Sequence, residues 1–347
     1  MGVKLGGLVE AKKVAIDDLA GRKIAMDGHN ILYQFLAIIR SRQGEPLKDR
    51  EGRVTSHLSG LIYRNSSLME AGLRVSYVFD GVPHRFKTKV VRERTQVRRE
   101  AKARYEEAVR EGRPEEARRY AQRAATVNTD IIADAKRLLT LMGIPWVQAP
   151  GEGEAQSSHM ARKGAVWGSA SQDFDSLLFG APILLRNLSI TGRRKLPRKN
   201  VYIRIEPEMI ELGKFLRELE LTHEQLVDVG ILAGTDYNPG GIKGIGPKTA
   251  LKLIRKHGSL EDAVPHIKNA EFPHPVEEIR ALFLSPRTTD DYTLEWRPPD
   301  REGIVEFLCS ERDFDRGRVL KAVERIGRGF SRGRERTTLD QWFKPGS

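Results

Sequence analysis

The chain has 347 residues, of which 39% are hydrophobic and 31% charged, and its formal net charge is +12. No apolar run approaches the roughly 18–20 residues that a membrane span needs, and the N-terminus lacks the apolar region of a secretory signal. Cys309 is the only cysteine, which excludes an internal disulfide and a cysteine-rich zinc site. We therefore expect a cytoplasmic protein, and the charge favours a polyanionic partner over a merely charged surface.

The first half of the sequence alternates short apolar runs with amphipathic stretches. The runs predict strands at residues 23–26, 75–79, 145–147, 166–170, 183–185 and 201–203. Helical periodicity fills the gaps over residues 31–39, 55–71, 130–142 and 154–163. Alternation of this kind predicts an α/β fold with a mainly parallel central sheet flanked by helices.

A long polar insertion separates the second predicted strand from the helix at 130–142. Residues 84–123 contain fourteen Lys or Arg and seven Glu, so this segment cannot pack on the sheet over much of its length. Good helix formers on both sides of Gly112-Arg113-Pro114 predict two charged helices that project from the body. A solvated hairpin is the plain alternative, but fourteen positive against seven negative charges leave +7, which favours contact with phosphates.

The second half of the sequence is more helical. Helices are predicted at 207–219 and 222–233, and Thr222 with Gln225 forms a capping box at the start of the second. Residues 325–336 are rich in Arg, Gly and Ser, a composition typical of a flexible basic linker. A short apolar island follows the linker, formed by Leu339, Trp342 and Phe343.

Acidic residues recur where the predicted strands end: Asp27, Asp80, the pair Glu152 and Glu154, and the pair Asp173 and Asp175. A seventh, Asp236, follows a helix. Because ligands of a parallel sheet gather at the carboxyl ends of its strands, we expect the first six to converge there. Any one of them could be an ordinary turn or helix-dipole residue, but six at one edge are less readily explained in that way.

Crowded carboxylates raise one another's pKa unless cations bind between them. Hard divalent cations prefer oxygen ligands, so we expect Mg²⁺ first and Mn²⁺ second. Two such ions can activate a water and stabilise the leaving oxygen of a phosphodiester. The acidic residues and the basic insertion together therefore predict metal-dependent hydrolysis of a nucleic acid.

Residues 241–248 (GIKGIGPK) form a glycine-rich stretch that differs from a nucleotide-binding loop. Pro247 separates Gly246 from Lys248, where a Walker loop has Gly-Lys-Ser/Thr. Proline suits the first position of a helix, so the stretch predicts a glycine turn that opens a helix. Its backbone N–H groups could bind a phosphate, while a plain helix–helix turn is the alternative.

These motifs together resemble the flap endonucleases of the XPG/Rad2-type superfamily, specifically the archaeal members. The similarity covers essentially the whole chain and rests on MGVKLGGLV, MDGHNILYQFL, TSHLSGLIYR, YVFDGVPHRFK, LLTLMGIPWVQAPGEGEAQ, SASQDFDSLLFG, LAGTDYNPGGIKGIGPKTALKLI and TTLDQWF. It implies a PIN-like 5′ nuclease fold and a structure-specific 5′ flap endonuclease and 5′–3′ exonuclease. The implied roles are Okazaki-fragment maturation and base-excision repair at the replication fork, by a chain that is monomeric by itself.

The resemblance also implies roles for individual residues. All seven acidic residues fall on the metal-site positions of the family, and Lys87 and Arg94 match the basic pair that reaches the scissile phosphate from the base of a helical arch. Tyr33 matches an aromatic residue that stacks on a base, and Gly2 and Arg40 are expected to contact DNA. Taken alone, Lys87 and Arg94 could be surface charges and Tyr33 a core aromatic residue.

Two further segments match parts of the family that hold partners. Gly244, Gly246 and Lys248 belong to a stretch that resembles the helix–turn–helix gripping duplex DNA, often with a K⁺ ion. Leu339, Trp342 and Phe343 resemble a motif that binds a PCNA-type sliding clamp. Arg336 stands where that motif usually has Gln, so the polar anchor is missing and the apolar side chains must supply most of the contact. A tail that folds back on its own domain is the alternative.

We therefore expect one nuclease domain over residues 1–330, followed by a flexible clamp-binding tail at 331–347. Within the domain we expect an N-terminal part at 1–105, the arch at 84–128, and an internal part at 129–265 with the helix–turn–helix at 240–257. One alternative is a nuclease of the same superfamily that prefers bubbles or four-way junctions. Another is a catalytically silent DNA-binding clamp adaptor.

Overall fold

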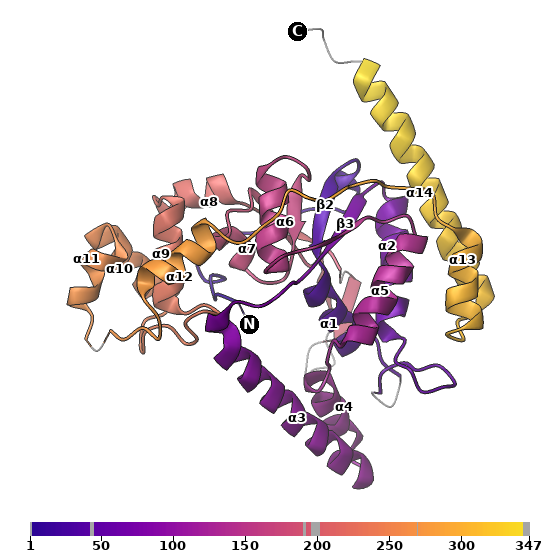
Figure 1. Ribbon diagram of the computed structural model, residues 1–347, viewed down its shortest axis with the longest axis horizontal. Coiled ribbons are helices and arrows are strands. Elements are labelled where there is room, and N and C mark those ends of the chain that lie inside the picture. The colour runs from indigo at the N-terminus through magenta and orange to yellow at the C-terminus, as the bar shows by residue number, and fades with distance from the viewer. Residues whose placement is uncertain (1, 42–44, 190–191, 196–201, 269, 343–347) are drawn as a thin grey trace.

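A mainly parallel sheet of seven strands lies at the centre of the molecule, with helices on both faces (Figure 1). The computed structural model describes residues 2–41, 45–189, 192–195, 202–268 and 270–342. The five strands β2 to β6 pair in parallel, whereas β9 pairs antiparallel with β1 and β6. In spatial order the strands are β1 (Lys12–Lys13), β9 (Glu208–Glu211), β6 (Ile183–Arg186), β5 (Gly168–Ala170), β2 (Lys23–Asp27), β3 (Arg74–Phe79) and β4 (Trp146–Gln148). The predicted α/β fold is confirmed.

The two faces of the sheet carry separate hydrophobic cores, because alternate residues of a strand point to opposite sides. Ile24 and Met26 of β2 point into one core, and Ala25 points into the other, where it packs near α6 (Gly153–Arg162). The first core is closed by α1 (Gly28–Ile38), α2 (Ser56–Glu70), α5 (Thr129–Leu141), α13 (Arg301–Val305) and α14 (Arg316–Trp342). Across the described ranges, no helix is long and apolar enough to cross a membrane.

A third group of buried residues joins one edge of the sheet to a helical region at the left of Figure 1. Leu184 of β6 and Ile210 of β9 belong to this core, together with Phe283. The capping box predicted at Thr222 and Gln225 is present and starts α9. The helices of this region are α7 (Asp175–Leu178), α8 (Leu212–Leu219), α9 (His223–Ala233), α10 (Pro247–His257), α11 (Leu260–Ala263) and α12 (Val276–Leu284).

The polar insertion forms two helices that project away from the sheet, α3 (Thr88–Arg110) and α4 (Pro114–Arg123) (Figure 1). The chain turns between them at Gly112, whose φ of 65° lies in the left-handed region that glycine adopts without strain. Small buried residues such as Ala101 and Ala108 let the two helices approach each other. The prediction of two charged helices broken at residues 112–114 is confirmed, and we call residues 84–128 the arch.

One predicted helix in the second half is partly wrong. Residues 207–219 were expected to be helical throughout, but the structure has strand β9 followed by helix α8. Met209 and Ile210 pair with Leu185 and Leu184 of β6, so pairing with a distant strand overrides the local preference. The strand expected at 201–203 is found as β8 (Tyr202–Ile205), which pairs with β7 (Gly192–Lys195) outside the main sheet.

The flexible linker predicted at 325–336 is wrong for residues 325–330, which continue helix α14 and lie against α2. Ile326 is fully buried in the first core, and Arg325 and Arg328 both pair with Glu70 of α2. Packing of one face against α2 therefore orders a segment whose composition favours flexibility. The backbones of Leu339 and Trp342 lie in the last turns of α14, and Phe343 falls outside the described residues.

Candidate active site and nucleic-acid interface

The first two acidic residues stand at the carboxyl ends of neighbouring parallel strands. Asp27 is the last residue of β2 and the N-cap of α1, where its Oδ1 accepts a hydrogen bond from the Asn30 N–H at 3.0 Å. Asp80 directly follows β3, and its Oδ1 accepts from the Gly153 N–H at 2.6 Å. This bond ties the end of β3 to the start of α6, which carries Glu154. Strand topology thus brings Asp27, Asp80 and Glu154 together at the carboxyl ends of the parallel strands.

The acidic side chains after β4 and β5 are held by short polar contacts. The Ser171 hydroxyl donates to Glu154 Oε1 at 2.6 Å, and Asn30 Nδ2 donates to Asp173 Oδ2 at 3.2 Å. The Val3 N–H donates to Asp175 Oδ1 at 2.6 Å. A Cβ on Gly2 would lie 2.6 Å from the same oxygen, so any larger residue at position 2 would force the Asp175 carboxylate or the N-terminal segment to shift.

Asp236 comes from the loop between α9 and α10 rather than from a strand end. Asn238 shapes this loop, since its side chain accepts from the Thr235 hydroxyl at 2.6 Å and donates to the Ile231 carbonyl at 2.6 Å. Asp236 is only 8% exposed, and its charge adds to the effect of burial in raising the pKa of Asp175. The structure therefore brings all seven predicted acidic residues into one cluster, which we call the acidic cluster.

Burial and mutual repulsion shift the pKa values within the acidic cluster. Burial, with the nearby charge of Asp80, raises the pKa of Asp27 well above its ordinary range. Burial and the charge of Asp175 do the same to the pKa of Glu154. Burial and the charge of Asp236 raise the pKa of Asp175 to about 7. These shifts mean that the ionised cluster is destabilised unless positive charge compensates it.

Two basic residues at the base of the arch supply such charge. Lys87, the last residue of η2 (Arg85–Lys87), places Nζ 2.6 Å from Glu152 and 3.5 Å from Asp236. Burial alone would lower the pKa of Lys87, but attraction to Glu152 and Asp236 outweighs it and raises the pKa. Arg94 of α3 donates through Nη2 to both Asp236 oxygens, at 2.7 and 2.8 Å. The structure therefore joins both predicted basic residues to the acidic cluster.

The donor chemistry of the acidic cluster fits hard divalent cations, because its ligands are carboxylate oxygens crowded enough to raise one another's pKa. Within the described part of the chain, however, no three His, Cys, Asp or Glu side chains are arranged as a ready-made metal site. Glu152 and Asp236 point instead to Lys87 and Arg94. A shared cation would require these side chains to turn.

Several polar residues of the site were not predicted from the sequence. Tyr237 donates its hydroxyl to Glu152, and its ring lies 5.0 Å from Lys87 Nζ. His29 Nδ1 accepts from the Asp80 N–H at 3.1 Å. Asn30 and Ser171 bind acidic side chains as described above. Each stands within three residues of an acidic residue in the sequence, and that proximity was the available signal.

Tyr33 on α1 and Arg40, two residues after the end of α1, both contact the arch. The Tyr33 ring is half-buried, and the guanidinium carbon of Arg98 on α3 lies 4.6 Å from its centre. Arg40 Nη2 donates to the Ala121 carbonyl of α4 at 2.7 Å. Tyr33 thus contacts an arch side chain, and Arg40 ties the returning helix of the arch to the end of α1.

The glycine turn lies at the start of α10. Gly244 has a φ of 85°, and Gly246 is the N-cap of α10 with Pro247 at its first position. Among the described residues, no side chain caps the start of α10 at Gly246, and Lys248 stands in the first turn of this helix. The predicted turn that opens a helix is confirmed, and its geometry leaves backbone donors at the helix start.

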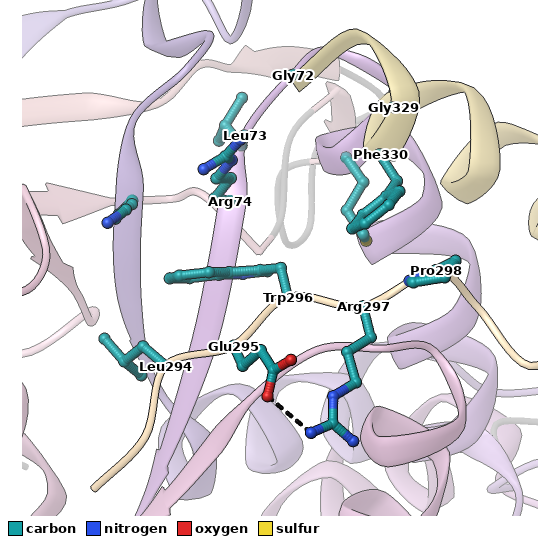
Figure 2. Close-up of a pocket in the computed structure, with 12 residues that line it drawn as sticks. Gly72, Leu73, Arg74, Leu294, Glu295, Trp296, Arg297, Pro298, Gly329 and Phe330 are labelled. Atoms are coloured by element: carbon teal, nitrogen blue, oxygen red, sulfur yellow. Dashed lines mark hydrogen bonds and ion pairs between the residues drawn. The ribbon is translucent and has the colours of Figure 1, made fainter. Parts of the chain in front are cut away.

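A cavity of about 510 Å³ lies elsewhere, at the opposite ends of the strands. Lys23 and Arg74, the first residues of β2 and β3, line it, whereas Asp27 stands at the far end of β2. Figure 2 shows Trp296 extending toward β3, where its Nε1 donates to the Val75 carbonyl at 2.7 Å. This cavity is about 13 Å of strand away from the carboxylates and is not part of the acidic cluster.

Two family models match the chain over the segments that supply the cluster. One, described as the XPG N-terminal domain, matches residues 1–101, and the XPG I-region matches residues 143–236. The chain is 53% identical to Flap endonuclease 1 of Pyrococcus furiosus over 344 residues, covering 99% of this chain and 100% of the relative. It is 50% identical to Flap endonuclease 1 of Aeropyrum pernix over 350 residues, with the same coverage.

Solved structures lead to the same family. Flap endonuclease-1 from Methanococcus jannaschii is similar with a TM-score of 0.75 and 40% identity, covering 95% of this chain and 99% of that one. The catalytic core of Rad2 in complex with DNA substrate is similar with a TM-score of 0.69, covering 94% and 100%, and its 22% identity shows a shared fold alone. The chain therefore belongs to the flap endonuclease family and is a hydrolase that cuts DNA.

Proposed function

We propose that the chain hydrolyses branched DNA at 5′ flaps, using the acidic cluster to hold two divalent cations, Mg²⁺ by preference and Mn²⁺ as a substitute. Cleavage would leave a 3′-hydroxyl on the released flap and a 5′-phosphate on the duplex. Gapped and nicked duplex ends would be cut at the same site in a 5′–3′ exonuclease mode. This activity suits Okazaki-fragment maturation and base-excision repair at the replication fork.

The observation that carries this proposal is the pairing of Lys87 and Arg94 with Glu152 and Asp236. Two cationic side chains from the arch are held at the acidic edge of the sheet, where a phosphodiester would have to enter. An entering phosphate offers them anionic oxygens in place of the carboxylates, and a guanidinium can grip such oxygens with two hydrogen bonds. Lys87 and Arg94 would therefore orient the scissile phosphate.

The residues that would hold the cations are Asp27, Asp80, Glu152, Glu154, Asp173, Asp175 and Asp236. When bound, the ions would supply Lewis-acid stabilisation of the charge that develops on the phosphate. Ser171 and the Gly153 N–H orient Glu154 and Asp80 through the hydrogen bonds described above. Release of Lys87 and Arg94 toward the phosphate would free Glu152 and Asp236 for the ions.

The flap would run along the basic arch, whose positive charge attracts the phosphate backbone. Tyr33 would stack on a base next to the scissile bond once Arg98 moves from its ring. Gly2 would let the N-terminal backbone lie close to the junction above Asp175. Arg40 would contact DNA at the end of α1, beside its bond to α4.

The duplex and the sliding clamp would bind at separate places. Gly244, Gly246 and Lys248 would hold a duplex phosphate at the start of α10, where no side chain of the described residues caps Gly246, and K⁺ would bind at the turn. Leu339, Trp342 and Phe343 would bind a PCNA-type clamp through apolar side chains. The chain would act as a monomer by itself.

The test is single-turnover cleavage of a double-flap DNA by the wild type and by Lys87→Ala, with Lys89→Ala as the control. Both variants lose one positive charge from the arch, but only Lys87 reaches Glu152, whereas Lys89 is exposed. We expect Lys87→Ala to lower the rate by about 10²–10³-fold, as loss of one well-placed electrostatic donor does, and Lys89→Ala to change it little.

The products and the substrates decide between this function and its alternatives. Cleavage at the flap junction in Mg²⁺, mapped to the nucleotide and absent in EDTA, supports the proposal. Faster cleavage of a bubble or a four-way junction would favour the related nucleases instead. Equal rates for wild type and Lys87→Ala would remove the proposed role of Lys87.

A further inference from the structure

The base of the arch is anchored in the helical region that carries the glycine turn. Phe86 of η2 is only 7% exposed and belongs to the core formed by α7 to α12. Its ring stacks on the imidazole of His274, with ring centres 3.6 Å apart and planes 5° from parallel. His274 stands just before α12 (Val276–Leu284), so the contact joins the arch to this helix.

Two neighbouring contacts support the same junction. Arg85 donates through Nη2 to Glu278 of α12 at 3.2 Å, and its guanidinium carbon lies 5.2 Å from the centre of the Phe86 ring. Both Arg85 and Glu278 are at least half exposed, so solvent screens this pair and it contributes little. The buried Phe86 ring and its stack on His274 therefore hold the junction.

The residue after Phe86 is Lys87, whose Nζ reaches Glu152 and Asp236. A backbone fixed at residue 86 restricts where the side chain of residue 87 can go. The same helical region supplies Asp236 and Tyr237, which contact Lys87 from the loop after α9. The stack thus fixes the backbone of Lys87 relative to the helical region that carries Asp236 and Tyr237.

We propose that His274 is a positioning residue, which through its stack on Phe86 sets Lys87 at the acidic cluster. This inference rests on the proposed function of Lys87 in orienting the scissile phosphate. Within the described part of the chain, His274 has no hydrogen bond or ion pair with the carboxylates or with Lys87, so its effect passes through Phe86.

The decisive variants are His274→Ala, which removes the stack, and His274→Phe, which keeps a flat ring in its place. His266→Ala is the matched control, because His266 stacks on His257 in the same region, with ring centres 4.2 Å apart, away from the arch. We measure single-turnover cleavage of a double-flap DNA and, with Ca²⁺ in place of Mg²⁺, the dissociation constant for that DNA.

We expect His274→Ala to slow cleavage at saturating DNA by about tenfold, since small misplacements of an orienting group have effects of this size or larger. Its dissociation constant should stay within about twofold of the wild-type value, because Lys87 acts on the bound phosphate. His274→Phe should recover most of the rate, and His266→Ala should match the wild type. If His274→Ala weakened DNA binding but left the cleavage rate unchanged, His274 would contact DNA directly and the inference would be overturned.

A second measurement needs no DNA and no metal. Ion pairs and burial protect the Lys87 amine from acylating reagents. The rate at which Lys87 is labelled, measured by mass spectrometry, therefore shows whether its side chain stays at the acidic cluster. We expect faster labelling of Lys87 in His274→Ala and wild-type labelling in His274→Phe and His266→Ala. If Lys87→Ala abolishes cleavage while His274→Ala keeps both rate and protection, the inference fails and the proposed function stands. If Lys87→Ala cleaves as fast as the wild type, the proposed role of Lys87 fails, and this inference fails with it.

Discussion

His57 of α2 is buried without a hydrogen-bond partner for either ring nitrogen, as far as the described residues extend. The Asp134 carboxylate lies 4.0 Å from Nε2 of His57, which is too long for a hydrogen bond. Asp134 is instead bound by Arg312 at 2.9 Å. Burial, with the nearby charge of Arg312, lowers the pKa of His57 to about 3, so this histidine is neutral in the folded protein.

The lowered pKa predicts a loss of stability in mild acid. Below the ordinary histidine pKa near 6.5 the unfolded chain takes up a proton, whereas the folded chain does not until the pH nears 3. The contribution of His57 is therefore complete above pH 7 and is lost as the pH falls from about 6.5 toward 3. Between pH 7.5 and pH 5 the loss should be about 2 kcal/mol.

Comparison of the wild type with His57→Leu isolates this effect from that of the carboxylates. Denaturant unfolding at both pH values gives the free energy of unfolding of each protein. Between pH 7.5 and pH 5, we expect the free energy of unfolding of the wild type to fall by about 2 kcal/mol more than that of His57→Leu. A difference that stays constant with pH would mean that His57 takes up its proton in the folded state.

At the scale of elements, local sequence patterns predicted most helices and strands, and non-local contacts explain the exceptions. The arch helices follow from composition and a glycine–proline break, which are local signals. β9 (Glu208–Glu211) exists because it pairs with β6, and α14 persists through residues 325–332 because its face packs on α2. Neither partner lies near these segments in the sequence, so the pattern alone favoured a helix and a linker.

Two glycines of α14 provide a test of that packing. A Cβ on Gly329 would overlap the Met69 carbonyl oxygen at the end of α2, whereas a Cβ on Gly327 would meet no atom within 4 Å. Gly329→Ala must therefore push α14 away from α2 and should cost about 1–3 kcal/mol. Gly327→Ala should stabilise the helix by up to about 1 kcal/mol, because alanine is the better helix former.

Thermal and denaturant unfolding of both variants gives these values. Opposite signs for the two substitutions are expected only if residues 327–329 form a helix docked on α2. Near-zero changes for both would be the result for a flexible linker, and would contradict the packing of α14 described above. A functional effect of Gly329→Ala is not required for this test.

At the scale of the whole molecule, the acidic cluster joins residues from both sides of the sheet and from the helical region. Six members could be placed from the sequence because they follow successive parallel strands. Asp236 could be placed only by resemblance, since the loop after α9 reaches the cluster through the packing of α9 against α7 and α12. The pairing of Lys87 and Arg94 with Asp236 likewise depends on where the arch base is anchored.

Because the ionised cluster is destabilising, divalent cations should stabilise the whole protein against unfolding. At a Mg²⁺ concentration of a hundred times the dissociation constant, the gain should be about 3 kcal/mol. The double variant Glu154→Gln with Asp175→Asn removes two repelling charges, and Asn can still accept from the Val3 N–H. Without divalent ions it should be more stable than the wild type by about 1–2 kcal/mol, and Mg²⁺ should shift it much less.

The control is Glu106→Gln with Glu107→Gln on the exposed face of α3. It raises the net charge from +12 by the same two units, so any effect of overall charge appears in both double variants. We expect it to be no more stable than the wild type in EDTA and to keep the full response to Mg²⁺. If Mg²⁺ and Mn²⁺ leave the unfolding of the wild type unchanged, or shift both double variants equally, the acidic cluster is not where the cations bind. If relief of repulsion within the acidic cluster is the cause, the two double variants should differ in stability both in EDTA and in Mg²⁺. Only Glu154→Gln with Asp175→Asn removes carboxylate charges that repel each other.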